Sequence, residues 1–180
     1  MQVGKRPAIF LDRDGVLNEE KSYICSIDDL VIFPYAEKCV RKIKDKGYYA
    51  IVITNQSGVA RGIFTEEQLK GMNQYLKQQI GVDAVYYCPH HPEGIIRQYR
   101  RSCYCRKPQT GLLEQACLDY NIDMEHSYLI GDRAGDIITG QRMGISTVLL
   151  ESGYGLERLE QLVRPDYVFK DLRDAVNNLL

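Results

Sequence analysis

Acidic side chains stand directly after two short apolar segments of the sequence. Asp12 and Asp14 follow the run 8–11 within the tetrapeptide Asp-Arg-Asp-Gly, and Asp132 follows residues 129–131. Carboxylates placed this closely can share a divalent cation, and a carboxylate is a competent nucleophile towards phosphorus. Asp and Gly also populate ordinary turns, and Asp132 also suits the N-cap of a helix. The spacing therefore indicates either metal-assisted phosphoryl transfer or structural turns.

Hydroxyl, amide and cationic groups follow two further segments. Thr54 closes the apolar run 48–54 and leads into the polar stretch 55–58, which offers hydrogen-bond donors to an anion. Arg106 and Lys107 precede a predicted helix, where cations are unfavourable at the positive end of the helix dipole unless an anion binds there. Each segment alone reads as a polar loop or a solvated charge pair. Together with the carboxylates they favour an anion-binding active site.

Four soft metal ligands form two pairs with identical one-residue gaps. Three thiolates and an imidazole are the donor set of a closed tetrahedral zinc site, which predicts structural zinc because no coordination position stays open. A chance group of buried cysteines or a redox pair is the alternative, and His91 is an alternative imidazole. The predicted ligands are Cys88, His90, Cys103 and Cys105. The zinc is expected to fix the loop 88–106, which delivers Arg106 and Lys107.

Short apolar runs alternate with segments of helical apolar spacing, which predicts an α/β fold with a doubly wound parallel sheet. Thr65 and Gln68 predict a capping box at the start of a helix, and Gly144 predicts the end of another. Such sheets bind ligands at the carboxyl ends of their strands, so the chemical groups above should converge. The predicted strands are 8–11, 48–54, 84–88, 127–130, 146–150 and 167–169, and the predicted helices are 36–43, 66–80, 112–120, 137–143 and 172–179.

Composition limits the class of protein. The 180 residues suit a single domain over 1–180 that includes the zinc loop 88–106, with no room for a large cap domain. A net charge of -1 gives no global basic field, so nucleic acid is not an expected partner. No apolar run approaches the ~18 residues of a membrane span, and no stretch near Met1 has the features of an export signal. We expect a cytoplasmic monomer with reduced cysteines.

In their order along the chain, the four strand-end motifs resemble those of the haloacid dehalogenase (HAD) superfamily of phosphatases, over essentially the whole chain. The resemblance implies that Asp12 attacks the phosphoryl group and forms an aspartyl phosphate, while Asp14 acts as general acid and base. It implies Mg²⁺ held by Asp12, the main-chain carbonyl of Asp14, and Asp132. Thr54 and Lys107 would then stabilise the transferring oxygens.

Within this superfamily the chain resembles the heptose bisphosphate phosphatases. The motifs that carry the resemblance are DRDGVLN at 12–18, TNQSGVARGIFTEEQL at 54–69, YYCPHHPEG at 86–94 and CYCRKP at 103–108. The resemblance implies removal of the 7-phosphate from D-glycero-D-manno-heptose 1,7-bisphosphate, on the route to nucleotide-activated heptose for surface glycans. It leaves the preferred anomer open.

The same resemblance implies a set of substrate contacts. The family often has lysine at position 133, and arginine keeps the charge there but changes the geometry. Arg61 is expected either to meet the distal phosphate or to cap its loop, and Asp136 either to support the metal or to begin a helix. The implied contacts, besides Thr54 and Lys107, are Glu20, Lys21, Ser22, Tyr23, Asn55, Gln56, Ser57, Arg106 and Arg133.

Two other functions compete with this interpretation. Histidinol-phosphate phosphatases share the zinc loop and the catalytic set, so residue chemistry alone leaves histidinol phosphate open as a substrate. A zinc-stabilised module that binds nucleic acid through the loop 89–101 would use Tyr99 and the arginines around it. The balanced charge and the convergent carboxylates oppose this second alternative.

Overall fold

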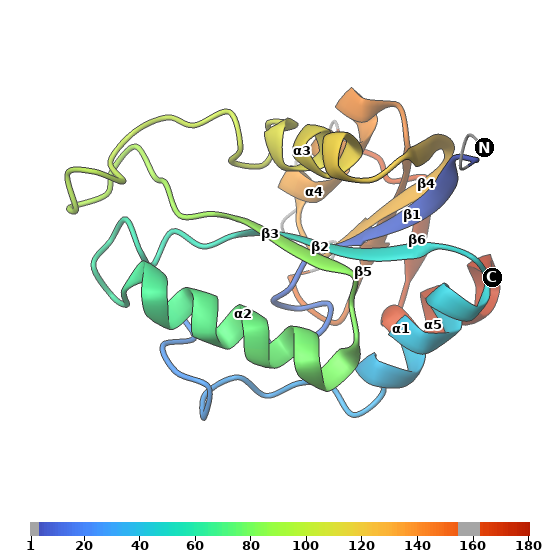
Figure 1. Cartoon of the computed structure of the whole chain (residues 1–180), viewed down its shortest axis with the longest axis horizontal. Helices are drawn as coiled ribbons and strands as arrows, with labels where there is room; N and C mark the ends of the chain where they lie inside the picture. Colours follow the sequence, from blue (N-terminus) through green and yellow to red (C-terminus); the bar gives the residue numbers. More distant parts are fainter. Residues whose placement is uncertain (1–3, 155–162) are drawn as a thin grey trace.

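Parallel strands form one sheet in the order β3-β2-β1-β4-β5-β6 in the computed structural model, which describes residues 4–154 and 163–180 (Figure 1). Residues 8–11 of β1 are fully buried because helices cover both faces of the sheet, which explains why this strand reads as a continuous apolar run. The strands are β1 (Arg6–Leu11), β2 (Tyr49–Asn55), β3 (Ala84–Cys88), β4 (Ile122–Gly131), β5 (Ser146–Leu150) and β6 (Tyr167–Phe169).

Helices pack on the two faces of the sheet in separate groups (Figure 1). Alternate residues of β1 serve the two faces: Ile9 and Leu11 belong to the core beneath α1, α2 and α5, whereas Phe10 belongs to the core beneath α3. On that second face a Cβ on Gly140 of α4 would lie 2.5 Å from Thr147 of β5, so this helix packs closely on the sheet. The helices are α1 (Ala36–Asp45), α2 (Glu66–Ile80), α3 (Gly111–Asp119), α4 (Ala134–Met143) and α5 (Leu172–Leu179).

The predicted fold class and order of elements are confirmed. The capping box at the start of α2 is present, with the Thr65 hydroxyl accepting from the backbone N–H of Gln68 and the Gln68 side chain accepting from the backbone N–H of Thr65. Gly144 ends α4 in the left-handed conformation, with φ of 68°. These two helix ends could be predicted from the sequence because each depends only on residues close together in the chain.

The two largest differences from the predicted boundaries are at the starts of β4 and α4. β4 begins at Ile122 rather than at residue 127, because Arg6 and Pro7 of β1 pair with residues 122 and 123 across a register shift. The exposed charged residues 125 and 126 interrupt the apolar pattern there, so tertiary pairing decides the strand. α4 begins at Ala134, three residues before the predicted start, because its first turn carries Asp136 as a polar cap.

The strand order indicates where on the sheet a ligand site would lie. The chain runs outward from β1 through β2 to β3, then returns to place β4 beside β1, so a topological switch point lies between β1 and β4. In Figure 1 the yellow-green segment after β3 and the segment between β2 and α2 extend from the same end of the sheet. Within the described residues, no helix is both long and apolar enough to cross a membrane.

Candidate active site

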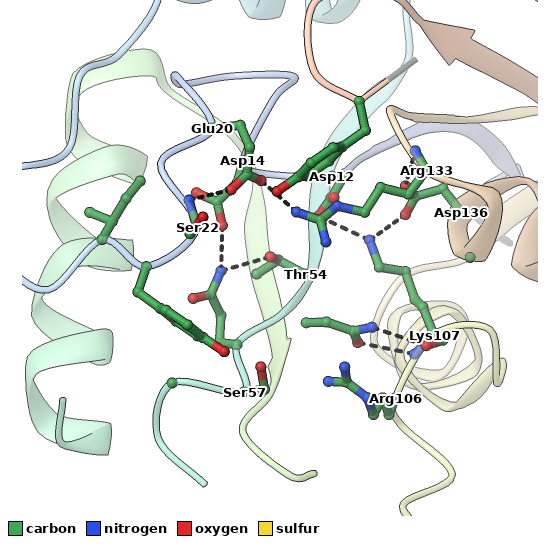
Figure 2. A pocket seen from close by; sticks show the side chains of 17 residues that line it. Asp12, Asp14, Glu20, Ser22, Thr54, Ser57, Arg106, Lys107, Arg133 and Asp136 are labelled. Atoms are coloured by element: carbon green, nitrogen blue, oxygen red, sulfur yellow. Dashed lines mark hydrogen bonds and ion pairs between the residues drawn. The ribbon is translucent and has the colours of Figure 1, made fainter. Parts of the chain in front are cut away.

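A pocket of about 450 Å³ opens at this edge of the sheet (Figure 2). Of the predicted substrate contacts only Lys21 does not line it: this side chain points its ammonium at the Glu19 carboxylate, 3.6 Å away. Asp132 is fully buried and contributes no lining surface. The pocket is lined by Asp12, Asp14, Glu20, Ser22, Tyr23, Ile24, Thr54, Asn55, Gln56, Ser57, Gly58, Arg106, Lys107, Arg133, Gly135, Asp136 and Tyr154.

Lys107 connects two buried carboxylates, one directly after β1 and one in the first turn of α4. Its Nζ lies 2.9 Å from Oδ1 of Asp12 and 2.5 Å from Oδ1 of Asp136, and it also donates to the carbonyl of Ile53 at 2.9 Å. Although burial opposes the charge, Asp12 and Asp136 raise the pKa of Lys107, so the ammonium stays protonated. The structure thus places a fixed cation beside the predicted nucleophile (Figure 2).

Lys107 precedes a helix as predicted, but the N-terminus of that helix does not position it. α3 begins at Gly111, with Thr110 as its N-cap, so Lys107 stands before the first turn of that helix. The side chain of Asn55 fixes the Lys107 backbone instead, donating to its carbonyl and accepting from its N–H at 3.0 Å each. Lys107 is therefore positioned by β2 and by carboxylates rather than by an anion at a helix end.

The carboxylates of Asp12, Asp132 and Asp136 form a group that could hold a metal ion, with ligand oxygens within 4.8 Å of one another. Oδ1 of Asp132 is buried without a hydrogen-bond partner, although the other oxygen accepts from the N–H of Tyr154 at 3.0 Å. Burial, Asp12 and Asp136 raise the pKa of Asp132 to about 8. A divalent cation would relieve this repulsion and use the orphaned oxygen, so these residues fit Mg²⁺.

The Asp14 carboxylate accepts hydrogen bonds from three side chains. Arg13 donates to both carboxylate oxygens at 3.0 Å each, and the amides of Asn18 and Gln56 donate at 2.8 Å each. Although burial opposes it, the Arg13 charge and these hydrogen bonds lower the pKa of Asp14. Arg13 is itself buried and donates to the side chain of Asn73 in α2 at 3.1 Å.

The segment after β2 supplies hydroxyl and amide groups to the same pocket. Thr54 is buried, and its hydroxyl accepts from the amide of Gln56 at 2.9 Å. That amide also donates to Asp14, so one side chain links the ends of β1 and β2. Figure 2 shows Ser57 and Arg106 towards one end of the pocket, away from the labelled carboxylates.

The four predicted zinc ligands lie together at the base of the loop after β3. His90 Nδ1 is 3.7 Å from Cys88 Sγ and 3.8 Å from Cys105 Sγ, and Cys103 Sγ is 2.9 Å from Cys105 Sγ. All four donor atoms lie within 4.8 Å of one another. This donor set fits zinc, since three thiolates and an imidazole complete a tetrahedron. His91 is not in the cluster.

Arg61 contacts the zinc loop and is absent from the pocket lining. Its Nη2 lies 3.3 Å from Nε2 of His91 and 3.8 Å from the carboxylate of Glu93. The neighbouring backbone is also joined, because Ile96 N–H donates to the Ala60 carbonyl at 3.0 Å. Of the two predicted roles for Arg61, this geometry favours the loop cap.

Several polar residues of the site were given no definite role from the sequence. Asp136 was left open as a metal support or a helix start; it accepts from the backbone N–H of Arg133 at 3.2 Å at the start of α4, and it also contacts Lys107. Arg13, Asn73 and Tyr154 were not predicted at all. Their partners are distant in sequence, so only the fold reveals them; the position of Arg13 between two candidate aspartates was the one available signal.

Comparison with known proteins gives consistent matches. The HAD-hydrolase-like family matches residues 104–175. A D-glycero-beta-D-manno-heptose-1,7-bisphosphate 7-phosphatase from Haemophilus ducreyi is 40% identical over 97% of this chain and 98% of its own length. A D-glycero-alpha-D-manno-heptose-1,7-bisphosphate 7-phosphatase from Photorhabdus laumondii is 43% identical over 83% of this chain and 85% of its own.

A solved structure agrees with these relatives. The crystal structure of a D,D-heptose 1,7-bisphosphate phosphatase from B. bronchiseptica, complexed with magnesium and phosphate, superposes with a TM-score of 0.82. It is 29% identical, and the match covers 96% of this chain and 97% of that chain. The parallel sheet and the carboxylate pocket at its switch point define a HAD-like hydrolase. The chain belongs to the family of D-glycero-D-manno-heptose-1,7-bisphosphate 7-phosphatases, which are phosphoric monoester hydrolases.

Proposed function

We propose that this protein hydrolyses the 7-phosphate of D-glycero-D-manno-heptose 1,7-bisphosphate with Mg²⁺, in the synthesis of nucleotide-activated heptose. The observation that carries the proposal is the buried group formed by Asp12, Asp132 and Asp136 with Lys107 beside it, on the floor of a pocket that two arginines also line. Family membership supports the same substrate class. A bisphosphate suits a pocket with cations both at its floor and on its wall.

Asp12 acts as the nucleophile. Its carboxylate oxygen forms a bond to phosphorus as the bond from phosphorus to the sugar oxygen breaks, which leaves an aspartyl phosphate and a sugar alkoxide. The Lys107 ammonium, 2.9 Å from Asp12, and the Thr54 hydroxyl stabilise the negative charge on the transferring oxygens. Because both groups are buried, they are in place before the reaction begins.

Asp14 moves the protons. It protonates the departing sugar oxygen, then takes a proton from the water that attacks the aspartyl phosphate, which releases phosphate and restores Asp12. The donors on Asp14 from Arg13, Asn18 and Gln56 stabilise its charged form, which is the form present between these two proton transfers. These neighbours therefore stabilise the carboxylate that proton donation to the leaving group leaves behind.

Mg²⁺ would be held by Asp12, the main-chain carbonyl of Asp14, and Asp132, and when bound it neutralises the charge that otherwise repels a phosphate dianion. The orphaned Asp132 oxygen supports this assignment. Asp136, the third member of this group of carboxylates, contacts Lys107. Glu20, Ser22, Tyr23, Asn55, Gln56, Ser57, Arg106 and Arg133 are proposed to contact the substrate, and Lys21 would have to turn towards it.

A structural zinc ion is proposed at Cys88, His90, Cys103 and Cys105. The nearness of the four donor atoms supports it, and their number leaves no position for a substrate. Cys105 is followed directly by Arg106, so the zinc would act on catalysis through the placement of that side chain.

The wider setting follows from the same chemistry. We propose one phosphatase domain over residues 1–180 that works as a cytoplasmic monomer on a small phosphorylated sugar, without a nucleic-acid or membrane partner. All six cysteines are unpaired, which suits a reducing compartment. The net charge of -1 also suits a small anionic substrate bound by local cations.

Phosphate release in the presence of Mg²⁺ tests the proposed function. Both anomers of the heptose bisphosphate should be compared with histidinol phosphate at equal concentration. We expect strong preference for one heptose anomer. Preference for histidinol phosphate would be consistent with the proposed mechanism but would contradict the proposed substrate. Release of phosphate from none of the three compounds would contradict the phosphatase assignment.

A further inference from the structure

Two arginines line the pocket, and their charges are compensated differently. Nη2 of Arg133 lies 2.6 Å from the carboxylate of Glu20, and its Nε lies 3.8 Å from Asp132. Arg106 forms no ion pair with a carboxylate in the described part of the chain, and its guanidinium contacts the His90 carbonyl at 3.4 Å. An uncompensated cation binds a phosphate dianion more strongly than a cation that already has carboxylate partners.

Arg133 is nevertheless held in a defined orientation that leaves it accessible. Its Cζ lies 4.2 Å from the centre of the Tyr154 ring, so the planar guanidinium stacks on an aromatic face. The Glu20 carboxylate approaches it from a different segment, as Figure 2 shows for these two labelled side chains. About half of the Arg133 side chain, 47%, remains exposed at the pocket.

The backbone around Tyr154 is joined to residues at the base of the pocket. Its N–H donates to Asp132 at 3.0 Å, and the Ser152 hydroxyl donates to the Gly15 carbonyl at 2.8 Å. A Cβ on Gly153 would lie 2.0 Å from the Asp132 carboxylate, so this segment passes directly over that residue. The segment that carries the ring is therefore attached directly to Asp132, a member of the buried carboxylate cluster.

We propose that Tyr154 determines specificity by positioning Arg133 to donate to uncharged hydroxyl groups of the sugar, while Arg106 binds the second phosphate. This inference rests on the proposed function and assigns separate parts of the substrate to the two arginines. Carboxylate partners weaken the attraction of Arg133 for a dianion, but its remaining N–H groups still donate to neutral oxygens. Stacking on Tyr154 reduces the freedom that the guanidinium would lose on binding.

The Tyr154→Leu variant tests the role of the ring because it keeps the backbone N–H that contacts Asp132. Three substrates separate the parts of the molecule: the heptose 1,7-bisphosphate, the heptose 7-phosphate, and p-nitrophenyl phosphate, which has no sugar. Relative to p-nitrophenyl phosphate, kcat/KM for both sugars should fall by about threefold to tenfold, mainly through KM. The matched Tyr154→Phe variant keeps the aromatic face, so its ratios of kcat/KM between the sugars and p-nitrophenyl phosphate should stay close to those of the wild type.

Variants of the two arginines complete the test. Arg106→Gln should lower kcat/KM for the bisphosphate relative to the 7-phosphate, because only the bisphosphate carries the second dianion. Arg133→Gln should lower kcat/KM for both sugars, and adding Tyr154→Leu to it should cause little further loss, since the ring acts through Arg133.

Several results would overturn the inference. A loss confined to the bisphosphate in Tyr154→Leu would mean that Arg133 binds the second phosphate. An equal loss of kcat/KM for p-nitrophenyl phosphate would mean that the ring supports the fold or the cluster formed by Asp12, Asp132 and Asp136. No loss of kcat/KM for any substrate would mean that the ring does not position Arg133. Wild-type protein that cleaves p-nitrophenyl phosphate but neither sugar would instead contradict the proposed function, and this inference with it.

Discussion

Asp12 is almost completely buried, and its carboxylate lies 2.9 Å from the Lys107 ammonium. Replacement by asparagine keeps the size and much of the hydrogen bonding of the side chain but removes the anionic nucleophile. We therefore predict that Asp12→Asn abolishes phosphate release while the fold and the zinc content stay unchanged. Asp28→Asn, at an exposed carboxylate, is the matched control and should keep full activity. Substantial turnover by Asp12→Asn would contradict the assignment of the nucleophile.

Asp132 predicts a pH dependence of stability in the absence of metal. Burial, Asp12 and Asp136 raise the pKa of Asp132 to about 8, from an ordinary value of 3.8. Between these values the folded state holds a proton that the unfolded state has released, so stability falls as pH rises from about 4 to 8. For one proton the slope reaches about 1.4 kcal/mol per pH unit.

Urea unfolding of the zinc-loaded protein, without added Mg²⁺ and with it, measures the effect over this pH range. We expect a falling free energy of unfolding without Mg²⁺, and a flatter profile with Mg²⁺, because the cation replaces the proton in stabilising the carboxylates. Asp132→Asn should flatten the profile without Mg²⁺ as well. Identical profiles with and without Mg²⁺ in the wild type would contradict metal binding at this group.

Sequence reasoning at this scale succeeded where a residue type and its place after a strand suffice. Asp12, Thr54 and Lys107 were predicted near one another from such positions, and the structure brings them into one pocket. The interaction of Arg13 with Asn73 was not predictable, because a buried amide on α2 has no local pattern that distinguishes it from an exposed one. The same limit applies to Tyr154, whose contacts with Asp132 and Arg133 are made only in the folded chain.

At the scale of elements, the zinc loop is attached both at its base and along its outer part. Its base carries the Cys/His cluster, and its outer part bonds to α2 through the Tyr99 hydroxyl, 2.6 Å from the Glu66 carboxylate. The Tyr87 hydroxyl of β3 contacts the same carboxylate at 2.8 Å. These hydrogen bonds do not involve the zinc ligands, so the outer part of the loop keeps contacts that do not depend on the metal.

Cys103→Ala tests the base of the loop. We predict about one zinc per wild-type chain by elemental analysis, a clear reduction in the variant, and lower activity because Arg106 is no longer held in place. Cys117→Ala removes a thiol outside the cluster and should retain zinc and activity. A fully folded, active wild-type protein without zinc would contradict the proposed ligand set.

The capping box of α2 allows a prediction about stability alone. Thr65→Ala removes the hydroxyl that accepts from the Gln68 N–H, so the free energy of unfolding should fall by about 1 kcal/mol. Thr65→Ser keeps an accepting hydroxyl and should lose much less. Urea denaturation distinguishes the two variants, and equal stability of Thr65→Ala and the wild type would contradict a contribution from the cap.

Helices and strands were predictable where local pattern and burial agree. The bounds of β5, β6 and α5 follow from short apolar runs and helical spacing, whereas the first half of β4 does not. That half pairs with Arg6 and Pro7 despite its charged residues, because the neighbouring backbone supplies the hydrogen bonds. The predicted start of α3, at residue 112, lies within one residue of the observed start at Gly111.

At the scale of the whole molecule, the strand order explains why groups far apart in the sequence meet. Asp12 and Asp132 are separated by most of the chain, yet they follow the neighbouring strands β1 and β4 at the switch point. A parallel sheet was predictable from alternating elements, and convergence at its carboxyl edge followed from that. The separate environments of Arg106 and Arg133 within one pocket required the three-dimensional structure.

The most direct test of the central claim is to identify the product by ³¹P NMR after Mg²⁺-dependent turnover of the heptose 1,7-bisphosphate. We predict loss of the resonance of the 7-phosphate, the appearance of inorganic phosphate, and retention of the resonance of the phosphate at C1. Retention of the 7-phosphate with loss of the phosphate at C1, or no reaction with either anomer, would contradict the assignment of this protein as a heptose bisphosphate 7-phosphatase.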